Sequence, residues 1–192
     1  SPYGPINVHF ISAKSSGLDS EHAGFITAIN ALNEEFIRYG RELAFRQGEK
    51  PDIIHCQDWI LFPAGQVLAH TWGVRVVSTV HLLDEPCQRW WGQVPDPENV
   101  RQEQRYCREA DALIAVSQAM ADVINQTHQV PNERLYVVHN GVNTPLFQPN
   151  VSPEARSRLR QTVGGDGNKI ILFAGRLSPV KGIDAFFAAA VQ

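Results

Sequence analysis

Short apolar segments alternate with longer amphipathic segments along the whole chain. The apolar runs are rich in Val and Ile and lack strict alternation of apolar and polar positions, which is typical of parallel strands covered on both faces. Between them, apolar positions recur at helical spacing, most extensively from about Ser20 to Gln47. The predicted strands are Ile6 to Ile11, Asp52 to Cys56, Val74 to Val80, Ala112 to Val116, Leu135 to His139 and Lys169 to Ala174. This order predicts an α/β fold with a doubly wound, Rossmann-like parallel sheet.

Three helix starts are predicted from residues that commonly cap a helix or occupy its first turn. Asp96-Pro97, Ser117 and Ser152-Pro153 each precede an amphipathic segment. In an open parallel sheet, ligands bind beyond the carboxyl ends of the strands. The loops that follow the predicted strands are therefore the places to search for function.

A linker pattern divides the chain near residue 148. Asn140-Gly141 forms a turn signal, and Pro145, Pro149 and Pro153 follow at regular spacing. We expect a first domain over residues 1–148. Residues 149–192 supply only a linker and the first strand-helix unit of a second domain, which cannot close a core alone. A strand in residues 149–192 would lack a neighbour, so we expect that two copies of the chain could associate through it.

Composition narrows the functional classes. The 192 residues carry a formal net charge of -3 without a concentrated run of Lys and Arg, which argues against a nucleic-acid partner. No apolar run approaches the roughly 20 residues of a transmembrane segment, and no secretory signal opens the sequence. Three cysteines without metal-site spacing read as reduced structural thiols, so we expect a cytoplasmic protein and no metal.

The richest candidate site follows the last predicted strand. Gly175-Arg176 and Lys181-Gly182 flank the start of a new helix, with the two cations five residues apart. Free amide groups at a helix N-terminus, together with two cations, suit a diphosphate. An exposed loop with two solvated cations explains the same spacing, and the residues alone leave both interpretations open.

Five motifs in order resemble the retaining glycosyltransferases of the GT-B fold. Each motif is weak alone, but together they extend over nearly the whole chain. The resemblance is to the glycogen synthase and sucrose synthase-like group, of the family 4 type, with the N-terminal domain followed by the start of the C-terminal one. The motifs are Pro51 to Trp59, Val77 to His81, Ala110 to Ser117, Val137 to Asn143 and Gly175 to Gly182.

This resemblance implies roles for individual residues. Arg176 and Lys181 would bind the diphosphate of a sugar nucleotide, with the backbone of Gly175 and Gly182 beside it. His81 would lie against the donor sugar as the catalytic residue of this half. Val180 and Asn143 depart from the family pattern, which often has Glu and Asp at these positions.

Asp58 and Trp59 match an acidic and aromatic pair that the family places on the acceptor side. The alternative is that Asp58 caps the helix starting near Leu61 while Trp59 packs against the sheet. Trp90 and Trp91, in the loop after His81, offer a stacking platform for a sugar, although adjacent residues rarely share one face. At most one of the two is expected in a site.

The implied reaction is transfer of a sugar from a nucleotide diphosphate to an acceptor, with retention at the anomeric carbon. It needs no cofactor and no metal; the partners are the sugar nucleotide and a carbohydrate or other acceptor. The family's E-x7-E pair lies beyond Gln192, so the chain alone is expected to be inactive. Two rivals remain: a noncatalytic scaffold derived from a glycosyltransferase domain, and a sugar-nucleotide epimerase.

Overall fold

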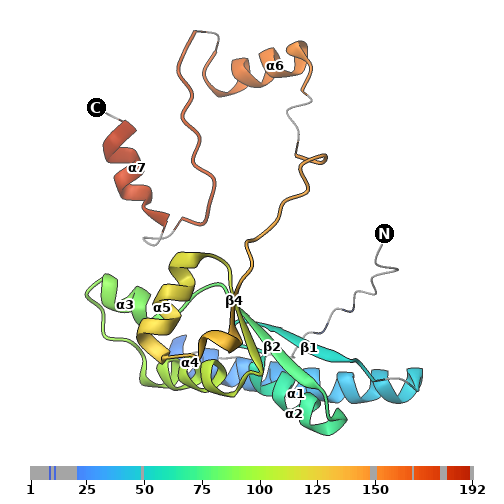
Figure 1. Cartoon of the computed structure of the whole chain (residues 1–192). Helices are drawn as coiled ribbons and strands as arrows, with labels where there is room; N and C mark the ends of the chain where they lie inside the picture. The colour runs from blue at the N-terminus through green and yellow to red at the C-terminus, as the bar shows by residue number, and fades with distance from the viewer. Residues whose placement is uncertain are drawn as a thin grey trace. The chain divides into compact units, whose positions relative to one another are not determined.

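The computed structural model describes residues 9, 11, 21–48, 50–147, 151–165, 167–177 and 181–190. The chain divides into two compact units, Ser1–Gly141 and Val142–Gln192 (Figure 1). Each unit is described by itself below. No helix among the described residues combines the length and the apolar character needed to cross a bilayer.

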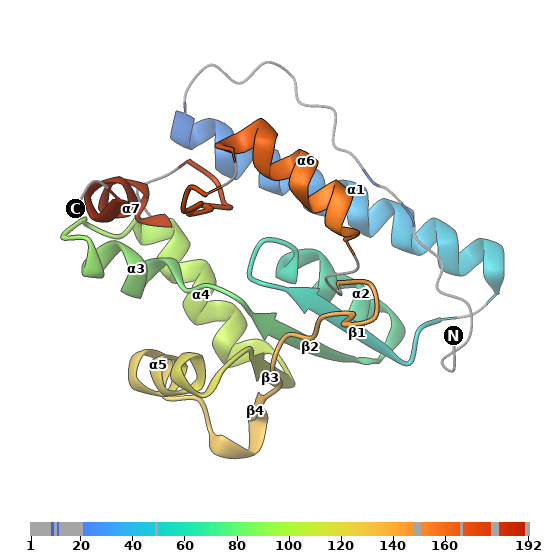
Figure 2. The same ribbon diagram turned by 90° about the horizontal axis from the view of Figure 1, so that it is seen from above.

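The first unit is built on a parallel sheet, as the alternation of segments predicts. Its four strands are β1 (Ile53–Gln57), β2 (Arg75–Val80), β3 (Ala112–Ala115) and β4 (Leu135–Val137), and they lie side by side in sequence order (Figure 2). These four confirm four of the predicted strands. The strand expected at Ile6 to Ile11 lies outside the described residues, apart from positions 9 and 11, which belong to no strand.

The helices that connect these strands are α2 (Phe62–Trp72), α3 (Asp84–Trp90), α4 (Pro97–Glu109) and α5 (Gln118–His128), with a 3-10 turn at Asn132–Arg134 before β4. On one side of the sheet, α2 packs on β1 and β2 and α5 packs on β3 and β4, while α3 packs on α4. Strands in sequence order with right-handed crossovers require this one-sided arrangement. The rings of Phe62 on α2 and Tyr106 on α4 are both buried, with centroids 6.0 Å apart, and Figure 1 shows α2 and α4 on the same side of the sheet.

The two faces of the sheet differ in burial. Cys56, Val76 and Leu113 point toward the helices and are buried, whereas Ile53 and Tyr136 on the other face are 52% and 53% exposed. The described helices therefore cover one face only. The four described strands follow sequence order and contain no reversal of the kind that defines double winding.

The long N-terminal helix α1 (Glu21–Gln47) confirms the predicted amphipathic segment and packs on α2. Asn33, only 6% exposed, joins the two elements. Its amide donates to the carbonyls of Ile29 at 2.9 Å and Ile60 at 2.8 Å, and its oxygen accepts from the Ala64 backbone N–H at 2.8 Å. The N-cap of α2, Leu61, makes no side-chain hydrogen bond, so Asn33 supplies the cap from a distant helix.

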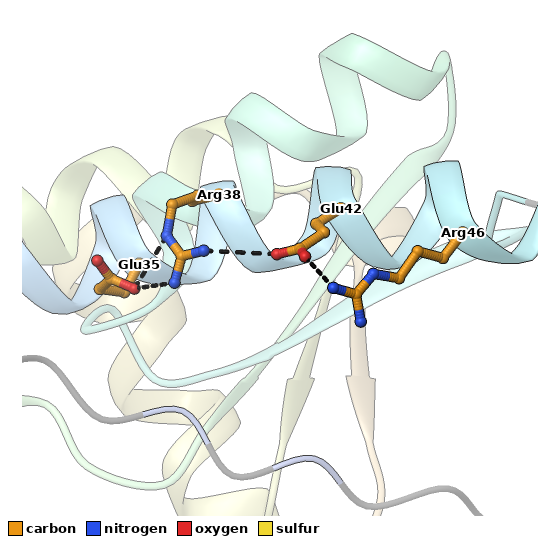
Figure 3. Close-up of polar contacts among 4 residues, drawn as sticks. All are labelled: Glu35, Arg38, Glu42 and Arg46. Carbon is orange, nitrogen blue, oxygen red and sulfur yellow. Dashed lines mark hydrogen bonds and ion pairs between the residues drawn. The ribbon is translucent and has the colours of Figure 1, made fainter.

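The opposite side of α1 carries a chain of ion pairs. Arg38 donates to Glu35 at 2.6 Å and to Glu42 at 3.4 Å, and Arg46 pairs with Glu42 one turn further on (Figure 3). Exposed pairs at these spacings contribute only about 0.3 to 0.5 kcal/mol each. They mark the solvent face of α1, while burial of Ile29 and Asn33 anchors the helix.

Two of the predicted helix starts in this unit have the expected caps. The Asp96 carboxylate accepts from the N–H groups of Glu98 at 2.8 Å and Asn99 at 3.1 Å, and Ser117 Oγ accepts from Met120 N at 3.1 Å. At the other end of α4, the guanidinium of Arg134 donates to the carbonyls of Arg108 and Ala110, each at 2.8 Å. Both ends of α4 are therefore satisfied by side chains.

The second unit contains α6 (Pro153–Val163), with the predicted cap from Ser152, and α7 (Ile183–Ala190). The strand predicted at Lys169 to Ala174 is wrong for this chain: residues 169–174 form no strand. The apolar run has the composition of a strand, but a strand exists only when a neighbour pairs its backbone groups. No described residue of this unit provides that neighbour.

Candidate functional site

The first predicted site residues lie at the carboxyl edge of the sheet. Asp58 directly follows β1, and His81 directly follows β2. Asp58 Oδ1 accepts from the backbone N–H of His81 at 2.7 Å and of Leu82 at 3.3 Å, while Asp58 N donates to Thr79 O at 2.8 Å. The structure therefore brings Asp58 and His81 together, as expected for two residues at one edge.

Asp58 occupies an unusual backbone conformation. Its φ of 55° lies in the left-handed region, which Asp tolerates better than most residues. The turn aims the carboxylate at the first residues after β2. Asp58 does not cap α2, because Leu61 is the N-cap and has no side-chain bond. Its observed role is to hold the backbone of His81.

A polar chain of side chains orients the His81 ring. Nε2 of His81 lies 2.7 Å from Gln57 Oε1, the Gln57 amide nitrogen lies 3.2 Å from His55 Nε2, and His55 Nε2 lies 2.7 Å from Thr79 Oγ1. An amide oxygen only accepts, so Nε2 of His81 carries the proton in this arrangement.

Gln57, His55 and Thr79 were missed by sequence reasoning. The alternation of side chains along a strand places His55 and Gln57 on one face, and the register pairs Gln57 with Thr79 on the neighbouring strand. The sequence shows that His55 and Gln57 are two residues apart, but it does not show the strand register that places Thr79 beside them. This register comes only from the packed sheet.

Trp59 is more deeply buried than its neighbour Asp58, which is half-buried. It is 8% exposed and belongs to the hydrophobic core. The structure therefore favours the packing role over the acceptor contact expected from the resemblance. The turn at Asp58 explains the separation, because it sends consecutive side chains in different directions.

The segment after His81, expected to be a loop, forms the two-turn helix α3. Glu103 of α4 holds its start: one carboxylate oxygen accepts from Asp84 N and the other from Glu85 N, at 3.2 Å for Glu85. Glu103 has no exposed surface. Burial raises its pKa to about 7, although the two accepted N–H bonds oppose the shift.

Glu103 is expected to make stability depend on pH. Its folded-state pKa lies above the usual 4.5, so the stabilisation from binding its proton is complete below pH 4.5 and is lost as pH rises through about 7. Glu103→Gln should reduce the difference in unfolding free energy between pH 5 and pH 8 by about 1 to 3 kcal/mol. Urea denaturation at both pH values measures it. Glu34→Gln, at an exposed position of α1, is the control, and an unchanged difference in Glu103→Gln would contradict the assignment.

Trp90 and Trp91 line the same pocket, although adjacent residues rarely share one face. Trp90 ends α3, and Trp91 is its C-cap, where the helical rotation between neighbours no longer applies. The pocket has a volume of about 250 Å³ and lies between α3 and α5. It is lined by Leu83, Pro86, Cys87, Trp90, Trp91, Met120 and Val123.

The donor-site candidates lie in the second unit, directly before α7. A Cβ placed on Gly175 would lie 3.8 Å from Lys181 Cγ, so the Lys181 stem passes beside Gly175. Arg176 follows Gly175, and both cations are exposed. The ring of Phe173 packs on the ring of Phe186 in α7, with centroids 5.4 Å apart. This contact keeps the segment that contains Gly175 close to the start of α7.

The residues around the start of α7 carry charges of both signs. Gly182, with φ of 65°, makes the turn into α7, and a cation at the positive end of a helix is unfavourable unless an anion is bound there. Asp184 adds one carboxylate to the first turn of α7. Residues 178–180 of the motif lie outside the described residues.

The sequence of the first unit matches a known protein family. The Glycosyltransferase Family 4 model matches residues 6–145. D-inositol 3-phosphate glycosyltransferase of Acidothermus cellulolyticus is 32% identical over 160 residues, covering 79% of this chain and 34% of that protein. Uncharacterized glycosyltransferase MJ1607 of Methanocaldococcus jannaschii is 29% identical over 171 residues, covering 88% and 43%. The chain thus spans less than half the length of these relatives.

Solved structures agree on the fold. Anabaena Alr3699/HepE in complex with UDP-glucose superposes with a TM-score of 0.66 at 24% identity, covering 83% of this chain and 40% of that chain. The parallel α/β sheet is therefore that of the GT-B glycosyltransferase N-terminal domain.

Proposed function

Because the chain belongs to glycosyltransferase family 4, we propose that it is the acceptor-side domain and the start of the donor-side domain of an enzyme that transfers a sugar from a nucleotide diphosphate sugar. The family match over residues 6–145 carries this proposal. The complex of the Anabaena relative with UDP-glucose supports a sugar nucleotide as the donor.

The roles proposed for single residues are those that the family resemblance implies, and the contacts within each unit support them. Lys181 and Arg176 bind the diphosphate, where two cations and the N-terminus of α7 favour negative charge. His81, held by Asp58 through its backbone and by Gln57 through its ring, contacts the donor sugar at the reacting centre.

We further propose that transfer proceeds with retention and without a metal. The cations Arg176 and Lys181 would stabilise the leaving diphosphate in place of a divalent ion. Proton NMR of the anomeric linkage in the first product, with chelator present, tests both statements. Inversion, or loss of turnover with chelator that a divalent ion restores, would contradict them.

Sugar-nucleotide binding separates this proposal from the scaffold alternative. The full-length parent is expected to show saturation-transfer NMR signals or a thermal shift with one class among uridine, guanosine and adenosine diphosphate sugars. Its transfer to an acceptor distinguishes it from an epimerase, which leaves the sugar on the nucleotide. A parent that binds none of the panel, with no E-x7-E pair after Gln192, would favour the scaffold.

A further inference from the structure

The pocket between α3 and α5, defined above, is apolar on every described side. Its walls are two indoles, aliphatic side chains, a thioether, a proline ring and the Cys87 thiol. Leu83 forms a buried part of the wall at 1% exposure, while Trp90 is 86% exposed at the rim. An exposed indole beside a hollow of about 250 Å³ leaves apolar surface in water, which costs free energy unless a ligand covers it.

The side chains that line the pocket indicate which class of ligand it can bind. A sugar bound on an indole needs hydrogen-bonding groups around its hydroxyls, because unpaired polar groups are costly to bury. None of the seven lining side chains carries a carboxylate, a carboxamide or a hydroxyl group. The pocket therefore suits a hydrocarbon group better than a sugar ring.

The position of the pocket connects it to the candidate reacting centre. Leu83 follows His81 by two residues, so their Cα atoms lie within about 7.6 Å. Met120 belongs to the first turn of α5, which starts beyond the carboxyl end of β3. By contrast, a second hollow lined by Lys50, Pro51 and Trp72 lies at the opposite edge of the sheet, before β1 and after α2.

We propose that this pocket binds the hydrocarbon part of the acceptor, so that the enzyme glycosylates a molecule whose polar head is joined to an aliphatic group. The head would face His81 and Gln57 at the carboxyl edge while the aliphatic group fills the space between α3 and α5. The volume accommodates part of such a group. This inference rests on the proposed function only in calling the ligand an acceptor.

Alkyl β-glucosides of increasing chain length, kept below their micelle concentrations, test the pocket in the 192-residue chain. The readout is alkylation of Cys87 by iodoacetamide, followed by intact mass. Cys56 and Cys107 are buried, so Cys87 is the accessible thiol. Octyl glucoside is expected to slow alkylation more strongly than hexyl glucoside, and methyl glucoside not at all. Each buried methylene should tighten binding by up to about fourfold.

Two substitutions locate the effect. Trp90→Ala removes an exposed rim residue and should weaken protection by octyl glucoside at least several-fold without unfolding the domain. Phe45→Ala removes an aromatic side chain of similar exposure, 88%, from α1, outside the pocket, and should leave protection unchanged.

Three results would overturn the inference. Equal protection by methyl and octyl glucoside would identify a sugar platform, and no protection at any chain length would leave the pocket without this ligand. Protection of Cys87 by protein concentration alone, with dimers seen in light scattering and lost in Trp90→Ala, would assign the pocket to a second copy. Sugar-nucleotide binding by the parent is measured separately, so failure here is distinguishable from failure of the proposed transferase.

Discussion

Lys181→Ala in the full-length parent is expected to lower kcat/KM by about thirty- to a thousand-fold. The ammonium group makes a charge-assisted contact with the diphosphate that strengthens as negative charge moves to the leaving group. Loss of that contact removes about 2 to 4 kcal/mol of transition-state stabilisation. Affinity for the free nucleoside diphosphate should fall as well, since part of the contact exists in the ground state.

Steady-state kinetics and calorimetry with the nucleoside diphosphate measure the two effects of Lys181→Ala. Lys169→Ala is the matched control, because Lys169 is an exposed lysine of the same unit outside the Gly175–Gly182 sequence motif. Lys181 is exposed, so its loss should not disturb folding. Equal kinetics in the two variants would show that the motif binds no diphosphate and that its cations are solvated.

His81→Ala is expected to lower turnover of the parent by about a hundred- to a thousand-fold while nucleoside diphosphate affinity stays nearly unchanged. The ring is proposed to contact the sugar and not the phosphates. Asp58 holds position 81 through the backbone N–H, which alanine retains, so the turn should keep its shape. The variant therefore removes the imidazole with little other change.

Calorimetry separates the roles of His81 and Lys181. Gln57→Ala provides a graded comparison, because it leaves the His81 imidazole in place but removes the acceptor of its Nε2 proton. A smaller loss of turnover is expected there than in His81→Ala. If His81→Ala weakened diphosphate binding as severely as Lys181→Ala, the division of roles between sugar and phosphate would be wrong.

Local chemistry made the starts of α4 and α5 predictable. Asp96 and Ser117 cap α4 and α5 as their residue types imply, because a cap needs only neighbours two or three residues away. The cap of α2 was not predictable. Asn33 provides it from 31 residues earlier, and the pattern around Leu61 contains no sign of that contact.

Pairing between segments distant in sequence decided which apolar runs form strands. The runs at β1 to β4 became strands because each found a parallel neighbour, whereas residues 169–174, with equally apolar composition, have none in the described part of the second unit. Strand propensity reports how well a side chain fits a sheet. It does not supply the partner that makes the sheet.

For the candidate site, the sequence by itself determined which residues end the strands, and therefore that Asp58 and His81 share the carboxyl edge. Alternation and strand order carry that information along the chain. Only the tertiary structure decided that Trp59 turns into the core, that Gln57 orients His81, and that Trp90 and Trp91 meet α5 around one pocket. These depend on strand register, on one turn at positive φ and on where a helix ends. Contacts between distant segments set all three, and no local pattern encodes them.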